Sequence, residues 1–139
     1  MSIQSRRLAG ILLIVLPTVM YGGVSLLQFL INDPAYMQNQ LRQDLFRAGH
    51  AHAGVLLILS LVALRYVDEA NLSDTWKMIA RNFIPLSAIL LPAAFFFSVL
   101  KSDATEPNGF IYLAYAGAFI LAIGVITLGV GLIRNKSVH

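Results

Sequence analysis

Two histidines and an arginine, placed where an apolar helix begins, are the residues of this sequence best suited to chemistry. His50, His52 and Arg47 lie within residues 46–54, immediately before the apolar run of residues 55–64. Imidazole ligates zinc, copper and haem iron, and it exchanges protons near neutral pH. Ionisable side chains inside a membrane are costly and usually functional. We therefore place the candidate site in this segment.

Helical geometry separates the two histidines. At 3.6 residues per turn, His50 and His52 point about 200° apart, so they cannot bind one metal ion unless the helix unwinds near Gly49. His50 shares a face with Arg47, and Asp44 can pair with Arg47 one turn earlier. His52 has no polar neighbour on its own helix, so its partners must come from other crossings. The available partners on the first and fourth crossings are Tyr21, Gln28, Tyr112 and Tyr115.

Three interpretations of the histidines remain open. In the first, each imidazole bonds a backbone carbonyl or a tyrosine hydroxyl and joins two helices. In the second, His50 or His52 is a ligand of haem, copper or zinc. In the third, the histidines form a proton relay or a pH-sensitive site, with Arg47 nearby opposing their protonation.

The metal interpretation has few further ligands to draw on. A structural zinc site usually takes four ligands, and the acidic residues expected at the same end are Asp33, Asp44, Asp103 and Glu106. A haem with two histidine ligands would need a second copy of the chain, because the other three crossings contain no histidine. His139 is C-terminal and is expected on the opposite side of the membrane, in a disordered tail.

The composition predicts a membrane protein. Of 139 residues, 58% are hydrophobic and 12% charged, whereas soluble domains carry about 25% charged residues. A crossing needs about 20 apolar residues, and four blocks meet this requirement: residues 8–31, 46–67, 79–100 and 110–133. The chain has no cysteine, which excludes disulfides and thiolate chemistry. We expect one all-α domain of residues 1–139, with four transmembrane helices in an up-down-up-down antiparallel bundle.

Two features refine this expectation. Residues 34–45 predict a short interfacial helix between the first two crossings, because Asp33 suits an N-cap and Pro34 a first turn. This helix can be continuous with the second crossing and bent near Gly49. Glycines recur every seven residues along the fourth crossing, where they would allow close helix packing, including packing between subunits. They are Gly117, Gly124 and Gly131.

The basic residues predict the orientation. Seven lysines and arginines fall at one end of the four crossings and three at the other. The seven are Arg6, Arg7, Arg65, Lys77, Arg81, Arg134 and Lys136, and the three are Arg42, Arg47 and Lys101. The positive-inside rule then places both termini in the cytoplasm and the histidine end outside. The net charge of +3 comes mostly from these flanking residues and does not indicate nucleic-acid binding.

The histidine segment also carries a resemblance. Residues 46–56, FRAGHAHAGVL, together with residues 16–23, LPTVMYGG, resemble a signature of small, uncharacterised four-helix bacterial membrane proteins. The resemblance covers the whole chain and implies a multi-pass protein of the bacterial inner (plasma) membrane, without an activity. A weaker similarity is to the histidine-bearing helices of haem–copper oxidase catalytic subunits and their small relatives. It would imply His50 or His52 as a haem or copper ligand, but the chain has no histidine on another crossing.

These observations favour a small integral membrane protein that self-associates or serves as a subunit of a larger membrane complex. Its polar site would contain His50 and His52 near the outer face. The sequence holds no conventional catalytic set, which argues against an enzyme. The alternatives are a haem- or metal-binding redox protein and a proton-coupled transport component.

Overall fold

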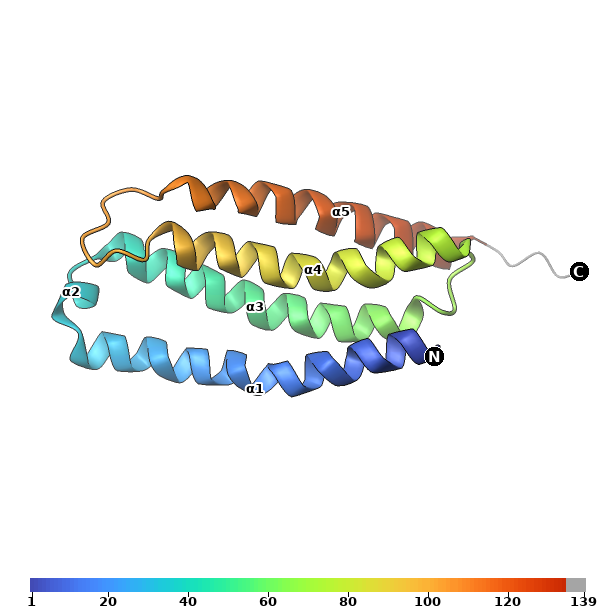
Figure 1. Ribbon diagram of the computed structural model, residues 1–139, viewed down its shortest axis with the longest axis horizontal. Helices are drawn as coiled ribbons and strands as arrows, with labels where there is room; N and C mark the ends of the chain where they lie inside the picture. Colours follow the sequence, from blue (N-terminus) through green and yellow to red (C-terminus); the bar gives the residue numbers. More distant parts are fainter. Residues whose placement is uncertain (135–139) are drawn as a thin grey trace, which may run out of the picture.

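Four long antiparallel helices account for most of the described residues. A computed structural model describes residues 1–134; Lys136 and His139 lie outside the described residues. The helices are α1 (Ile3–Asn32), α2 (Pro34–Met37), α3 (Gln40–Tyr66), α4 (Asp74–Ser98) and α5 (Tyr112–Ile133), with a 3-10 turn η1 (Gly109–Ile111) before α5. Within residues 1–134 there is no strand. Figure 1 shows the long helices alternating in direction.

The four long helices are each apolar and long enough to cross a membrane, the last counted with η1 as Gly109–Ile133. The predicted crossings fall largely within α1, α3, α4 and α5. The all-α fold with four membrane-crossing helices is therefore confirmed. It is the fold of a multi-pass membrane protein.

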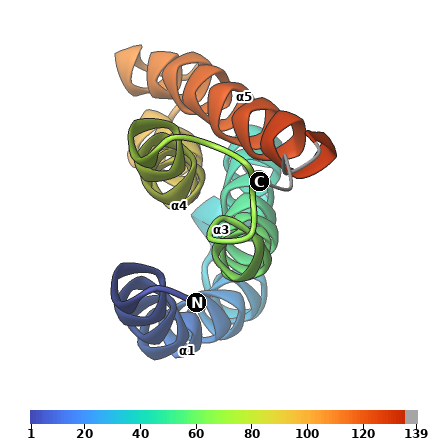
Figure 2. The same ribbon diagram turned by 90° about the vertical axis from the view of Figure 1, so that its right-hand side faces the viewer.

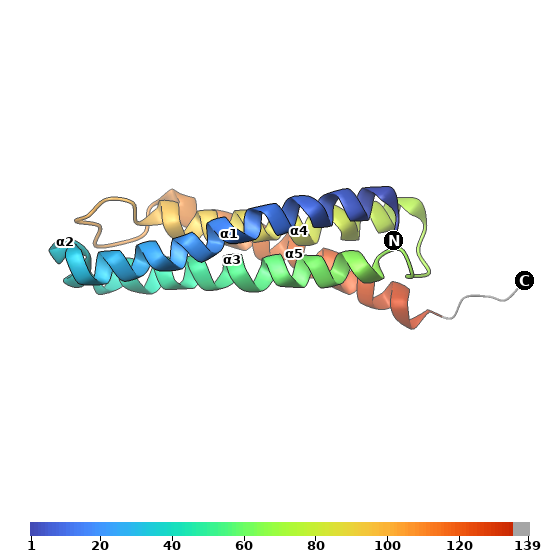
Figure 3. The ribbon, with the colours of Figure 1, turned by 90° about the horizontal axis from the view of Figure 1, so that it is seen from below.

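The helices form a curved row rather than a closed square. α1 packs mainly on α3, α3 on α4, and α4 on α5, and Figure 2 shows α1 and α5 at opposite ends of the row. Figure 3 shows α1 lying over α3 near α2 and over α4 near its own N-terminus. In the most apolar stretch of α1 only 6% of residues are buried, against 39% in α4. α1 is therefore the least covered helix.

Two apolar clusters hold the row together. One joins α3, α4 and α5 near the termini and includes Ala63, Ile84 and Leu128. The other lies at the α2 end and includes Leu26 of α1, with the aromatic rings of Tyr36 and Phe46. Each cluster removes apolar side chains from contact with lipid and water through close packing.

The connection between α1 and α3 differs from the prediction. The helix expected at residues 34–45 ends at Met37, and α3 begins at Gln40. The break occurs because the Asn39 side chain accepts a hydrogen bond from Arg42 N at 3.0 Å and caps α3. α3 is continuous through Gly49, so the helix does not unwind there. Gly49 instead lies against the ring of Phe96, where a Cβ atom would come within 3.0 Å.

The glycine repeat of α5 packs within the chain. A Cβ atom at Gly117 would lie 3.0 Å from Leu91 Cγ, and one at Gly124 would lie 2.8 Å from Ile84 Cγ1. Gly131 lies under Leu72 of the α3–α4 connection, and its carbonyl accepts a hydrogen bond from Asn71 N at 2.7 Å. The repeat therefore brings α5 onto α4 and is not free to pack between subunits.

We expect Gly124→Ala to destabilise the protein by about 1–3 kcal/mol, because the added methyl overpacks the α4–α5 contact. Unfolding of purified protein in detergent measures the effect. Gly129→Ala is the matched control, since a Cβ atom there meets nothing within 4 Å. Equal stability of the two variants would contradict the described packing of α5 on α4.

Candidate functional site

α3 turns its two histidines toward different helices, as the helical period predicts. His50 faces α1, and its ring lies in a notch formed by two glycines. A Cβ atom at Gly23 would lie 3.0 Å from His50 Nε2, and one at Gly22 would lie 3.6 Å from Nδ1. Only glycine allows a backbone to come this close to the imidazole. Among the described residues, no hydrogen bond reaches either ring nitrogen of His50.

His52 faces α4. Its Nδ1 lies 2.7 Å from the carbonyl oxygen of Ala48. Because a carbonyl only accepts, Nδ1 carries the proton in this bond. The imidazole ring lies against the ring of Phe95, with centroids 5.0 Å apart. The expectation that His52 lacks a polar partner on its own helix was wrong, since the carbonyl one turn earlier is within reach of its side chain.

Asp44 and Arg47 form the predicted pair, away from the histidines. Arg47 Nη2 donates to Asp44 Oδ1 at 2.9 Å, and Arg47 Nε donates to the Gln43 carbonyl. Both side chains are more than half exposed, at 54% and 59%. An exposed pair of this kind contributes little to stability, and neither residue bonds to His50 within the described chain.

The proposed partners of His52 lie elsewhere. Tyr21 is 73% exposed on α1, while Tyr112 and Tyr115 are exposed on α5 with their rings 6.2 Å apart. Gln28 accepts a hydrogen bond from Asn32 on the same helix. None of the four makes a hydrogen bond or ring contact with His52 among residues 1–134. The structure therefore does not bring the predicted polar site together.

The donor set within one chain does not fit a metal site. In the described part of the chain, no three histidine, cysteine, aspartate or glutamate side chains lie close enough to hold a metal ion. His50 and His52 face different helices, and the acidic residues expected near them do not join either imidazole. A metal site built from three or more such side chains therefore does not form around His50 or His52 within residues 1–134.

Arg42 is a polar feature that sequence reasoning missed. Its side chain is only 8% exposed, and Nε donates to the Val99 carbonyl at 3.1 Å. The guanidinium carbon lies 5.1 Å from the centre of the Phe46 ring and 5.7 Å from that of Tyr36. Nη1 is buried and has no hydrogen-bond partner among residues 1–134. Arg42 thus ties α3 to the end of α4 through the hydrogen bond to Val99, while its cation–π contacts stay within α2 and α3. Its place in a basic-residue count could not reveal these contacts.

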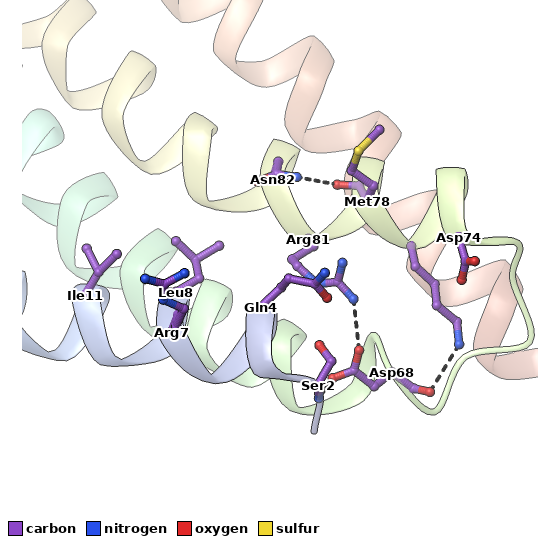
Figure 4. Close-up of a pocket in the computed structure, with 11 residues that line it drawn as sticks. Ser2, Gln4, Arg7, Leu8, Ile11, Asp68, Asp74, Met78, Arg81 and Asn82 are labelled. Atoms are coloured by element: carbon purple, nitrogen blue, oxygen red, sulfur yellow. Dashed lines mark hydrogen bonds and ion pairs between the residues drawn. The ribbon is translucent and has the colours of Figure 1, made fainter.

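A second polar group that the sequence analysis missed lies at the end of the molecule where α1 begins (Figure 4). Asp68 accepts a hydrogen bond from Ser2 N at 2.6 Å and pairs with Arg81 Nη2 at 2.9 Å. Arg81 Nε also donates to Ser5 Oγ at 3.0 Å, and Ser5 is fully buried. This network fastens the start of α1 to α4 and to the α3–α4 connection.

The same network lowers the pKa of the Asp68 carboxyl. Burial alone would raise this pKa, but hydrogen bonds from Ser2, Ser5 and Arg81 stabilise the carboxylate and hold the pKa at about 2, from 3.8. The Asp68 and Arg81 side chains are 16% and 13% exposed. The ionised pair of Asp68 and Arg81 is therefore much less exposed to solvent than the pair of Asp44 and Arg47.

Comparison with protein-family models, curated proteins and solved structures found no match to this chain. The resemblance of residues 46–56 and 16–23 to small bacterial membrane proteins stays a prediction.

We expect Gly23→Val to separate α1 from α3, because the larger side chain displaces the His50 ring at a cost of roughly 1–3 kcal/mol. The chain has no cysteine of its own. The rate at which one introduced pair of cysteines forms a disulfide therefore reports the distance between α1 and α3. A Cβ atom at Gly54 would lie 3.9 Å from Val19 Cγ1. The Val19→Cys/Gly54→Cys variant should therefore form a disulfide, and adding Gly23→Val should slow it, as measured by mass spectrometry after alkylation.

The control for Gly23→Val is Gly10→Val on the same helix, where a Cβ atom meets nothing within 4 Å. It should leave disulfide formation unchanged. If Gly23→Val also leaves the rate unchanged, the contact between His50 and α1 does not set the spacing of the two helices.

Acid should weaken the protein through Asp68. Because the folded-state pKa of Asp68 lies below its usual value, the carboxylate stabilises the fold above about pH 4, and this contribution disappears as the pH falls through about 2. The shift corresponds to at most about 2 kcal/mol, reduced by solvent screening. Thermal unfolding in detergent at pH 6 and pH 2.5 should show a smaller acid effect in Asp68→Asn than in the unmodified chain.

Glu69→Gln is the matched control, since Glu69 pairs with Arg65 where both side chains are at least half exposed. It should keep the acid sensitivity of the unmodified chain. The assignment fails if Asp68→Asn retains that full sensitivity.

Proposed function

We propose that this chain is a small subunit of a membrane assembly, which associates through α1 with a second copy or with another membrane protein. The observation that carries the proposal is a row of polar side chains along the least covered helix. We call this row the polar face of α1. Its members are Thr18, Tyr21, Ser25, Gln28 and Asn32.

The spacing of the polar face supports a helix–helix contact. Its residues alternate three and four apart, which is the spacing of the seam between two packed helices. In lipid, polar side chains on a helix surface are favoured where another helix supplies hydrogen bonds and close packing. The face is mostly exposed in the single chain.

The hydrogen bonds of the polar face are only partly made within the chain. Thr18 and Ser25 donate to carbonyls of α1, at 2.7 and 3.0 Å. Asn32 donates to Gln28 at 2.7 Å. The hydroxyl of Tyr21 has no hydrogen bond among the described residues. A neighbouring helix that covers this face would supply the missing partner.

The proposal includes the orientation and the location. The excess of lysine and arginine at the termini end supports cytoplasmic termini in a bacterial inner (plasma) membrane. In this arrangement His50 and Arg42 lie toward the outer side, where they position α1 and the α4–α5 connection. We propose no enzymatic role for them.

Single cysteines along α1 test the proposal, because the chain has none of its own. We expect Thr18→Cys, Tyr21→Cys and Gln28→Cys to form disulfide-linked dimers in membranes if the partner is a second copy. The matched controls carry cysteine on another exposed face, at Leu13, Met20 and Leu27, which are 56%, 66% and 53% exposed. These controls should stay monomeric.

A heterologous partner predicts a different outcome in the same membranes. No variant would form a homodimer, but gentle extraction would recover the chain in a particle heavier than the 15.2 kDa monomer, and Tyr21→Leu would release it. Equal cross-linking on both faces would contradict the proposal. So would a monomer that is unaffected by Tyr21→Leu.

A further inference from the structure

A groove runs between α1 and α4, and no residue of the polar face of α1 is among those that line it. It consists of two cavities of about 870 and 470 Å³. Both are lined by Leu8, Ile11 and Asn82, so the two cavities adjoin each other. The larger lies at the termini end and is charged, and the smaller lies deeper along the helices and is apolar. The groove therefore changes from polar to apolar along its length.

The charged end has an excess of positive charge. Its ionisable residues are Arg7, Lys77, Arg81, Asp68 and Asp74, and Figure 4 shows Arg81 and Asp68 facing each other. Because Arg81 and Asp68 neutralise each other, Arg7 and Lys77 remain as two positive charges beside the single exposed carboxylate of Asp74. Arg7 has no hydrogen bond or ion pair among the described residues. In the part of the chain that the structure describes, the one hydrogen bond of Lys77 Nζ is to the Asp68 carbonyl, at 3.3 Å.

The apolar end has the length of one membrane leaflet. Its wall on α1 runs from Leu8 to Val19, its floor includes Ala53 and Leu57 of α3, and Ile89 lies on the α4 side. Eleven helical steps cover about 16 Å, close to half of the roughly 30 Å hydrocarbon core. Over this length, a volume of about 470 Å³ leaves a cross-section much smaller than that of an α-helix, which is about 10 Å across. An acyl chain suits it better.

We propose that the groove binds one anionic phospholipid, with its headgroup in the charged end that Arg7 and Lys77 line and an acyl chain in the slot between α1 and α4. Arginine and lysine both bind phosphate oxygens through charge-assisted hydrogen bonds. The positive excess at the charged end favours a headgroup with net negative charge over a zwitterionic one. The inference is independent of the proposed assembly through the polar face.

Lipid-dependent thermal stability of the purified full chain tests the headgroup. A ligand that binds only the folded state raises the unfolding temperature. Phosphatidylglycerol should raise it more than phosphatidylcholine, and inorganic phosphate should have no effect. Arg7→Gln/Lys77→Gln should weaken apparent phosphatidylglycerol binding roughly ten- to thirty-fold, at about 1 kcal/mol per basic residue. Arg6→Gln/Lys77→Gln is the matched control, since Arg6 is exposed outside the groove, and it should retain more of the binding.

A second pair of variants tests the slot. Ala53→Leu fills its floor and should reduce the number of phospholipids retained in native mass spectrometry by one. Ala51→Leu adds the same atoms at an exposed position outside the groove and should not. The proposal is overturned by equal stabilisation with phosphatidylcholine and phosphatidylglycerol, by stabilisation with inorganic phosphate alone, or by equal lipid retention in both alanine variants.

Discussion

The position of α1 depends on the close approach of two glycines to an imidazole. Gly22 and Gly23 let the backbone of α1 come against the His50 ring, where a Cβ atom at Gly23 would be 3.0 Å from Nε2. Beyond this point Leu26 enters the aromatic cluster of the α2 end. At its other end α1 is held by the hydrogen bonds of Ser2 and Ser5. Between these anchors α1 passes from α4 toward α3 (Figure 3), and the groove lies between α1 and α4.

The two outer helices of the row use their small and polar residues differently. α5 packs its glycines onto α4 and the α3–α4 connection, so its contact face is filled within the chain. α1 meets α3 mainly through its Gly22–Gly23 notch and Leu26, and it leaves a row of polar side chains uncovered. Since polar groups in hydrocarbon need partners, α1 is the helix on which a further protein surface is expected.

Much of the fold follows from hydropathy and helical period. The four apolar blocks predicted the long helices, and the 3.6-residue period placed His50 and His52 on different faces. The cap at Asn39 was missed because Asp33 and Pro34 also predict a helix start, and both starts occur. The packing of the glycine repeat within its own chain was not predictable. The spacing of the glycines indicates a close helix contact but does not show which helix is the partner.

The polar groups that matter most to the structure were the least visible in the sequence. Arg42 and Asp68 lie next to apolar blocks, where a charge usually marks a membrane boundary. Their burial depends on the Val99 carbonyl and the Phe46 ring in one case, and on Ser2, Ser5 and Arg81 in the other. These contacts join distant parts of the chain, so the spacing of neighbouring residues in the sequence does not predict them. The prediction of partners for His52 was wrong for a related reason. The helical period shows which face a residue lies on, but it does not show how far apart two helices are.

We propose that protein rather than lipid covers the polar face of α1 in the membrane. A photo-reactive amino acid at position 21, compared with one at position 20, measures this directly in intact cells. Both native side chains are strongly exposed, at 73% for Tyr21 and 66% for Met20. We expect a protein adduct of one defined mass from position 21 and lipid adducts alone from position 20. Lipid adducts alone from both positions would contradict the proposal.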